Sequence, residues 1–196
     1  SNTAHTAITV VAVNDAPVLD LDADNSAATA ANYATTFTEN GAAVAIADTD
    51  VSITDVDDTN IASASITLTN PQTGDSLAAG ALPAGITLDG ASTATHIILT
   101  GSATLADYQT ALQAVTFSNS SENPDTTVRD VTVTVNDGDA NSNTAHTAIT
   151  VVAVNDAPVA TNDAWIISNN TTASLPLTAL LGNDTDAEGD PLIVTA

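Results

Sequence analysis

Asp and Asn side chains are concentrated in short turns of this chain, at a spacing that suits cation binding. The sequence NDGDANSN places Asp137 and Asp139 on either side of a Gly, with Asn141 and Asn143 at the next alternate positions. Oxygen ligands that alternate around a Gly-containing turn fit Ca²⁺, which takes six to eight hard oxygens from a flexible loop. Because the chain has no Cys, a thiolate zinc site is excluded.

The same kinds of ligand recur in other turns and in two linkers that both read VNDAP. They are Asn14 with Asp15, Asn155 with Asp156, Glu39 after a strand, Asp55, Asp57, Asp58 and Asn60 in one turn, and Asp184, Asp186, Glu188 and Asp190 around Gly189. Each turn alone is also explained by the preference of Asp and Asn for turns, and an acidic surface can serve solubility alone. Their grouping beside both linkers favours calcium sites in a β context.

The two linkers belong to a repeat. Residues 1–18 and 142–159 are the same string, SNTAHTAITVVAVNDAPV, which indicates one turn of a tandem array. We therefore expect five segments: residues 1–13 as the last strand of a preceding module, 14–17 as a linker, 18–154 as a complete module, 155–158 as a second linker, and 159–196 as the start of a following module of a different type.

Composition limits the partners of this chain. It carries 24 acidic residues against one cation, Arg129, for a net charge of -23, and only Glu39, Glu122 and Glu188 are Glu. Such a surface repels nucleic acid and anionic membranes. No apolar stretch is long enough to span a membrane, so no membrane insertion is expected. The 43% hydrophobic content predicts a folded core.

The hydrophobic pattern predicts an all-β fold, an antiparallel β-sandwich with one short helix. Expected strands cover residues 33–38, 43–47, 61–70, 86–88, 95–100, 115–117, 128–136 and 145–154. Helical spacing of Leu105, Tyr108 and Leu112 after a possible cap at Thr104 predicts the helix.

Individual residues carry further expectations. Arg129 shares strand parity with inward Val residues, so it is expected at the rim of the core, paired with an acid such as Glu122 or Asp130. Trp165 is expected to pack within the following module or to form a sugar platform. No nucleophile turn or Gly-rich phosphate loop is present, so the chain is not expected to be an enzyme.

The arrangement resembles cadherin-like domains, whose inter-domain calcium sites use a Glu near an early strand, a D-x-D turn and an N-D linker. More specifically, TFTENGAAVAIADTDVSITDVDDTNIASASITLTNP, GSATLADYQTALQAVTFSNSSENPDTTVRDVTVTVNDG and the repeated string resemble the repeat of roughly 140 residues in giant type I-secreted bacterial surface proteins and RTX-type adhesins. The tail from residue 156 is similar to the opening of a second cadherin-like type.

The resemblance implies a set of ligands for each junction between modules. The first junction would use Asn14, Asp15, Glu39, Asp55 and Asp57. The second would use Asp137, Asp139, Asn155, Asp156, Asp184 and Asp186, with either Asp163 or Asp190. The partners of the module would then be its neighbours in the same chain, joined through Ca²⁺.

The implied function is that of a calcium-rigidified extender on the bacterial cell surface, which holds a terminal binding domain away from the cell. One alternative is a calcium-dependent carbohydrate-binding module. Against it, Tyr33, Phe37, Tyr108 and Phe117 all occupy expected core positions. A second alternative is a subunit that associates laterally in an extracellular fibre or surface layer.

Overall fold

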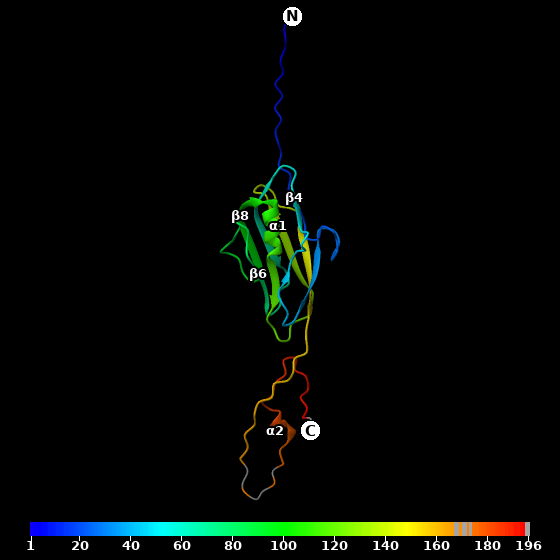
Figure 1. Ribbon diagram of the computed structural model, residues 1–196, viewed down its shortest axis with the longest axis vertical. Helices are drawn as coiled ribbons and strands as arrows, with labels where there is room; N and C mark the ends of the chain where they lie inside the picture. The colour runs from blue at the N-terminus through cyan, green and yellow to red at the C-terminus, as the bar shows by residue number, and fades with distance from the viewer. Residues whose placement is uncertain (167–168, 170–171, 173, 195–196) are drawn as a thin grey trace.

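The computed structural model describes residues 1–166, 169, 172 and 174–194. It is elongated, and one β-rich module stands between an extended N-terminal segment and a smaller C-terminal part (Figure 1). The predicted all-β sandwich is confirmed: strands make up most of the regular structure. We call the end of the module beside residues 14–17 the entry end, and the end beside residues 155–158 the exit end.

The larger sheet has six strands in the order β2-β11-β10-β5-β8-β7. Its strands are β2 (Tyr33–Thr38), β5 (Asn60–Leu68), β7 (Thr87–Leu88), β8 (His96–Thr104), β10 (Arg129–Asn136) and β11 (Ala145–Val152). Neighbours are antiparallel except β2 and β11, which pair in parallel. As a result β2 and β11 both finish at the exit end, whereas β10 finishes at the entry end.

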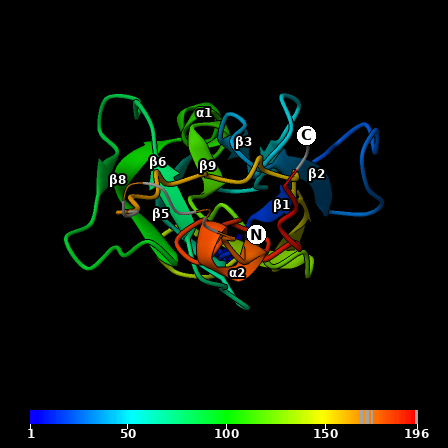
Figure 2. The same ribbon diagram turned by 90° about the horizontal axis from the view of Figure 1, so that it is seen from below.

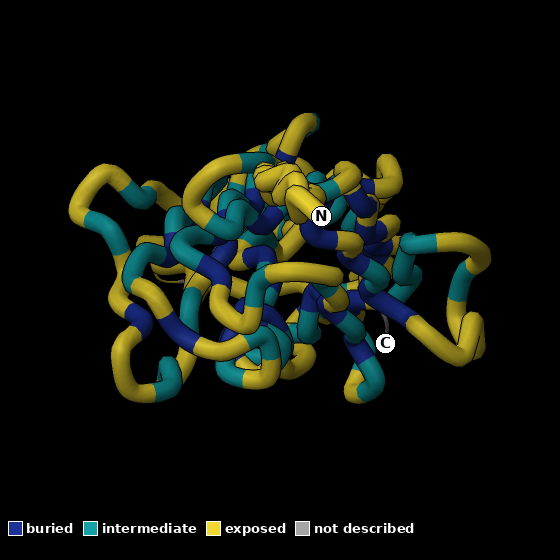
Figure 3. Tube along the Cα trace, turned by 90° about the horizontal axis from the view of Figure 1, so that it is seen from above, coloured by how far each residue is buried: buried dark blue, intermediate teal, exposed yellow. Residues whose placement is uncertain are grey.

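The opposite layer consists of two smaller sheets and a helix. One sheet has the order β3-β9-β6 and the other pairs β1 with β4. The elements are β1 (Val18–Asp20), β3 (Val44–Ala45), β4 (Ser52–Thr54), β6 (Asp75–Ala79), β9 (Val115–Asn119) and α1 (Leu105–Gln113). Phe37 of β2 and Phe117 of β9 meet edge to face between the layers, with ring centroids 5.7 Å apart. Viewed along the long axis, buried segments lie between the layers (Figure 3).

All eight predicted strands are present, but the sequence pattern missed β1, β4 and β6. The first two have three residues each, and β6 reads DSLAA, which has little β propensity. Each exists because a neighbour satisfies its backbone: β1 pairs with β4, and β6 pairs with β9. Tertiary pairing therefore decides these strands.

Helix α1 is confirmed, together with its cap. The Thr104 hydroxyl accepts from the Asp107 backbone N–H, and the Asp107 carboxylate accepts from the Thr104 backbone N–H, which completes a capping box. On the inner face, the buried Tyr108 hydroxyl donates to the Gly101 carbonyl at 2.8 Å. Burial raises the pKa of Tyr108 to about 12.

Loss of this cap has a measurable cost. Thr104→Ala is expected to lower the free energy of unfolding by about 1 kcal/mol, because it removes the acceptor for a helix N-terminal N–H. Urea unfolding measures the change. Thr110→Ala in the same helix is the control: Thr110 is exposed in mid-helix, so its replacement with a better helix former costs little. Equal losses in the two variants would contradict the capping role.

Arg129 lies deeper than the sequence suggested. It is fully buried, and its Nε donates to Asp75 Oδ2 at 2.7 Å, with the Asp75 side chain also fully buried. Further donors reach the carbonyls of Asp125 and Thr127. The predicted partners Glu122 and Asp130 are therefore wrong. Asp75 begins β6, directly across the core from β10, so the pair joins the two layers.

The repeated string adopts two structures in one chain. In β11, alternate residues are buried, with Ile149 0% and Val151 2% exposed. At the corresponding positions of the N-terminal copy, Ile8 is 85% and Val10 is 88% exposed, and residues 1–17 contain no strand. Residues 1–13 were expected as the last strand of a preceding module, and that expectation stays a prediction; here they pair with no described strand.

The C-terminal part holds little regular structure among its described residues. It contains α2 (Leu177–Leu180) and a single bridge between Val159 and Thr185. In Figure 1, α2 lies beyond the linker, away from the module, and in the view from below it therefore stands in front of the module (Figure 2). Trp165 is 49% exposed, so the expectation that it packs into a core is wrong here.

Candidate metal centres at the two ends of the module

Acidic side chains from three parts of the sequence meet at the entry end. We call them the entry cluster: Asn14 and Asp15 in the first linker, Asp55, Asp57 and Asp58 after β4, and Asp137 and Asp139 after β10. Both strands finish at this end, so the turns that follow them face the linker. The carboxylates of Asp55, Asp57 and Asp58 offer ligand atoms that lie within 4.8 Å of one another.

Hydrogen bonds tie the linker to these turns. The Asn14 side-chain amide donates to Asp137 Oδ2 at 3.0 Å, and the Asp15 backbone N–H donates to Asp57 Oδ1 at 3.2 Å. Asp55 Oδ2 is buried and accepts no hydrogen bond. A buried carboxylate oxygen without a donor is costly, and a cation would satisfy it.

Hydrogen bonds and neighbouring charges shift the pKa values of three acids in the entry cluster, Asp55, Asp58 and Asp137. The backbone N–H of Asp58 lowers the pKa of Asp55, and the backbone N–H of Ala140, followed by the Asn14 amide, lowers the pKa of Asp137. Burial, and then the negative charges of Asp55 and Asp57, raise the pKa of Asp58. The cluster therefore concentrates like charges that repel one another.

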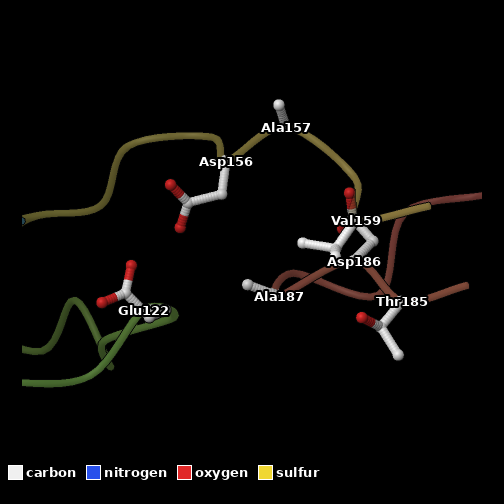
Figure 4. A pocket seen from close by; sticks show the side chains of 7 residues that line it. All are labelled: Glu122, Asp156, Ala157, Val159, Thr185, Asp186 and Ala187. Carbon is white, nitrogen blue, oxygen red and sulfur yellow. The ribbon is translucent and has the colours of Figure 1, made fainter. Parts of the chain in front are cut away.

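A second group, the exit cluster, surrounds the other linker. It consists of Glu39 after β2, Glu122 after β9, Asp156 in the linker and Glu188 in the C-terminal part. Glu39, Glu122 and Asp156 offer carboxylate oxygens within 4.8 Å of one another. Figure 4 shows the carboxylates of Glu122 and Asp156 facing the same space, beside Asp186. The Asp156 backbone N–H donates to Glu188 Oε2 at 3.2 Å.

Three carboxylates of the exit cluster each have one buried oxygen that accepts no hydrogen bond. Glu39 is only 4% exposed; its Oε2 accepts from the Val154 backbone N–H at 2.7 Å, while its Oε1 is buried without a donor. Asp156 Oδ2 and Glu188 Oε1 are likewise buried without a donor. The one cation of the chain, Arg129, is buried against Asp75 and does not compensate them. These residues fit a hard cation such as Ca²⁺.

The predicted grouping of the ligands was partly wrong. Glu39, expected at the first junction, lies at the exit end beside Val154 and Asp156. Asp137 and Asp139, expected at the second junction, lie at the entry end near Asn14. Strand direction is the reason: β2 runs parallel to β11 and β10 runs antiparallel to it. That Asn14, Asp15, Asp55 and Asp57 belong together, as predicted, agrees with the structure.

The remaining predicted residues line the second linker. Asn155 donates to the Asp156 carbonyl at 2.9 Å, as Asn14 does to the Asp15 carbonyl at 3.1 Å. Asp184, Asp186 and Asp190 line a pocket with Asn155 and Asp156. Asp184 Oδ1 accepts from Thr161 N–H and Asp186 Oδ1 from Asp190 N–H. Asp163 is exposed and lines neither of the two pockets beside this linker.

Sequence reasoning did not place Glu122 in a cation site, and it named Glu188 only as part of the turn around Gly189, although a signal for their grouping existed. The chain has only three Glu residues, and all three lie in the exit cluster. Every other acid in the chain is Asp, whose side chain is shorter by one methylene. The rare Glu residues therefore indicate positions from which a carboxylate has to extend further to meet the others.

A third acidic group lies on the side of the module. Asp22, Asp24 and Asp50 offer oxygens within 4.8 Å and could also hold a metal ion. Asp22 is fully buried and accepts from Ala27 and Ala28 N–H at 2.8 and 2.7 Å. Burial acts to raise its pKa, but these donors outweigh it and the pKa is lowered. Asp22 thus organises its own loop.

Comparisons with family models, curated proteins and solved structures gave no match to this chain. Among the described residues, no helix has the length and apolar character needed to cross a membrane.

Proposed function

We propose that this chain is a calcium-rigidified structural extender, a repeat of a large secreted bacterial surface adhesin that spaces a terminal binding domain from the cell. The observation that carries the proposal is the set of buried carboxylate oxygens without donors at the second linker, above all Glu39 Oε1 and Asp156 Oδ2. These oxygens converge where one module gives way to the next.

The ligands at each end come from separate parts of the chain. At the exit end Glu39 and Glu122 would hold the ion from the module, Asp156 from the linker, and Glu188 from the part that follows. At the entry end Asp55, Asp57 and Asp58 would hold it together with the linker. A bound cation supplies positive charge that these acids otherwise lack, because the module exposes no Lys or Arg.

A bound cation would decide how rigid the junction is, because few other contacts join the module to the C-terminal part. Residues 153–158 form no ladder. Among the described residues, the hydrogen bonds that fasten the linker and the C-terminal part are few: Val154 N–H to Glu39, Asp156 N–H to Glu188, and the Asn123 amide to the Ala187 carbonyl. Without a cation, repulsion among the carboxylates opposes this arrangement; with a cation, the same groups are drawn together. Extracellular calcium modules bind at about 10⁻⁴ to 10⁻³ M, which suits calcium levels outside cells.

The alternatives receive less support. A carbohydrate platform requires exposed aromatic rings, but in the module Phe37, Tyr108 and Phe117 are buried and Tyr33 is partly buried against the core. That leaves Trp165 of the C-terminal part, which is 49% exposed, as the aromatic ring that could contact a sugar. Lateral association into a fibre would bring two strongly acidic surfaces together, and no exposed Lys or Arg is present to offset their charge.

The test removes one charge from the exit cluster. Glu39→Gln keeps the side-chain shape, and it is expected to weaken calcium binding at the exit end about tenfold, a loss of about 1.4 kcal/mol. Isothermal titration with CaCl₂ measures the affinity. Asp89→Asn removes the same charge in the turn between β7 and β8, where Asp89 Oδ1 accepts from Ala91 N–H, and it should leave calcium binding unchanged.

Thermal unfolding separates a ligand from a structural residue. In calcium, Glu39→Gln should melt below the parent chain. In chelator it should melt at the same temperature or higher, because a repelling charge has been removed. A variant that is equally destabilised in both conditions would overturn the proposed role of Glu39.

A further inference from the structure

Glu122 differs from Glu39 in how its position within the exit cluster is fixed. Glu39 directly follows β2, and its backbone N–H donates to the Val152 carbonyl at 2.9 Å. Glu122 lies instead in residues 120–128, which join β9 to β10 and form no strand; we call them the exit loop (Figure 4). Its side chain is exposed, and the hydrogen bond to its carboxylate, from the Asn40 amide, is 3.3 Å long. The place of this carboxylate therefore depends on what holds the loop.

Arg129 holds the second half of the exit loop. It begins β10, directly after the loop, and its guanidinium donates to two loop carbonyls, from Nη2 to Asp125 at 2.9 Å and from Nη1 to Thr127. The Asp125 carboxylate lies 3.7 Å from Nη1. Pro124, the residue before Asp125, is buried, and its ring fixes φ. The backbone is thus anchored shortly after Glu122.

Asp75 connects Arg129 to the other end of the same loop. Its Oδ2 accepts from Arg129 Nε and its Oδ1 accepts from the Asn119 amide, each at 2.7 Å. Asn119 Oδ1 in turn accepts from the Ser121 backbone N–H at 2.7 Å, directly before Glu122. Both ends of the exit loop are therefore fastened to one buried ion pair.

We propose that the Arg129–Asp75 ion pair positions the exit cluster, because it holds the loop that carries Glu122. The carboxylate of Glu122 then meets those of Glu39 and Asp156 at one point. Groups that orient a metal ligand without touching the metal commonly change the metal affinity about 10- to 100-fold. The inference rests on the proposed function, since it gives the pair a role in the same calcium site.

The donor pattern explains why an Arg stands at this position in a chain with no other cation. A planar guanidinium donates in several directions, so it can bind a carboxylate and two carbonyls at once. The ammonium group of a Lys would keep the positive charge beside Asp75 but would not reproduce this pattern. Arg129→Lys should therefore retain the ion pair and loosen the exit loop.

The experiment follows calcium binding at each end separately, by amide NMR of the full chain during titration with CaCl₂. The Val154 N–H donates to a carboxylate of the exit cluster, and the Ala140 N–H donates to one of the entry cluster, so they report the two ends. Arg129→Lys is expected to weaken calcium binding about tenfold at the exit end and to leave the entry end unchanged. Val133→Ala, at a fully buried position of the same strand, controls for general destabilisation and should leave both affinities unchanged.

Two further variants test the route through Glu122. In a Glu122→Gln background, Arg129→Lys should weaken binding at the exit end no further, because it acts through Glu122. Asn119→Ala releases the other end of the loop without changing a charge, and it should also weaken binding at the exit end alone. This variant carries the test if Arg129→Lys does not fold.

Hydrogen exchange in chelator gives a readout that needs no calcium. The Thr127 N–H, which donates to Asp125 Oδ1 at 2.7 Å, should exchange faster in Arg129→Lys than in the parent chain or in Val133→Ala. The inference is overturned if Arg129→Lys binds calcium at the exit end as the parent does, loses affinity equally at both ends, or adds its loss to that of Glu122→Gln. An exit end that does not respond to calcium in the parent chain would instead count against the proposed function, and the exchange rates would then decide whether the ion pair holds the loop.

Discussion

Replacing Arg129 with Ala is expected to lower the free energy of unfolding by about 3–5 kcal/mol, because it leaves the buried Asp75 carboxylate without its cation. Both side chains are fully excluded from solvent and joined at 2.7 Å. The remaining donors to Asp75 are the Gln72 backbone N–H and the Asn119 amide, both at 2.7 Å. They satisfy hydrogen bonds but do not compensate the charge. A loss of this size would consume much of the stability of a typical domain.

The matched variants separate charge from volume. Arg129→Met retains most of the buried chain length, so it should remain strongly destabilising if the uncompensated charge is the cause. Combining it with Asp75→Asn removes that charge and should recover a large part of the loss. Urea unfolding at fixed calcium measures all four members of the cycle. Additive losses, with no recovery in the double variant, would show that the ion pair contributes nothing specific.

Removal of calcium is expected to have the second large effect. At a free calcium concentration one hundred times Kd, each occupied site adds about 2.7 kcal/mol, so one site at each end adds about 5 kcal/mol. For a chain of this size, roughly 2–4 °C of melting temperature accompanies each kcal/mol, so excess chelator should lower it by roughly 10–20 °C. Differential scanning calorimetry with and without chelator measures the shift.

The shape should change together with the stability. We expect chelation to shorten the particle in small-angle X-ray scattering, because the linker acids no longer hold the C-terminal part in line with the module. Magnesium at the same concentration is the control and should restore less, since Mg²⁺ demands a tighter octahedral site. Identical melting curves and scattering profiles in calcium and chelator would rule out the mechanism.

Much of the architecture could be predicted because it depends on local pattern. Alternation in residues 128–136 and helical spacing after Thr104 place β10 and α1 close to their observed bounds. β6 was invisible to such reasoning: DSLAA is a strand only because β9 pairs with it. The partner of Arg129 was invisible for the same reason, since Asp75 is distant in sequence and lies opposite it only after the layers pack.

The acidic turns illustrate the same division. Their composition indicated cation ligands, and residues near each linker were expected to share a site. Assigning Glu39 and Asp137 to an end required the direction of β2 and β10 in the sheet. The direction of β10 could have been inferred from the sequence. The strand before the second linker, β11, must end at the exit end, so the hairpin that joins β10 to β11 must turn at the entry end. Nothing in the sequence indicated that β2 pairs in parallel with β11.

The sequence by itself determined the β class, the inward side of most strands, the capped helix and the supply of oxygen ligands, because these follow from residue type and spacing. Only the tertiary structure decided which ligands meet, and whether a strand forms at all. The string SNTAHTAITVVAV shows why: beside β10 and β2 it is a buried strand, and at the N-terminus, without neighbours, it is exposed. A strand satisfies its backbone and buries its side chains only against other strands.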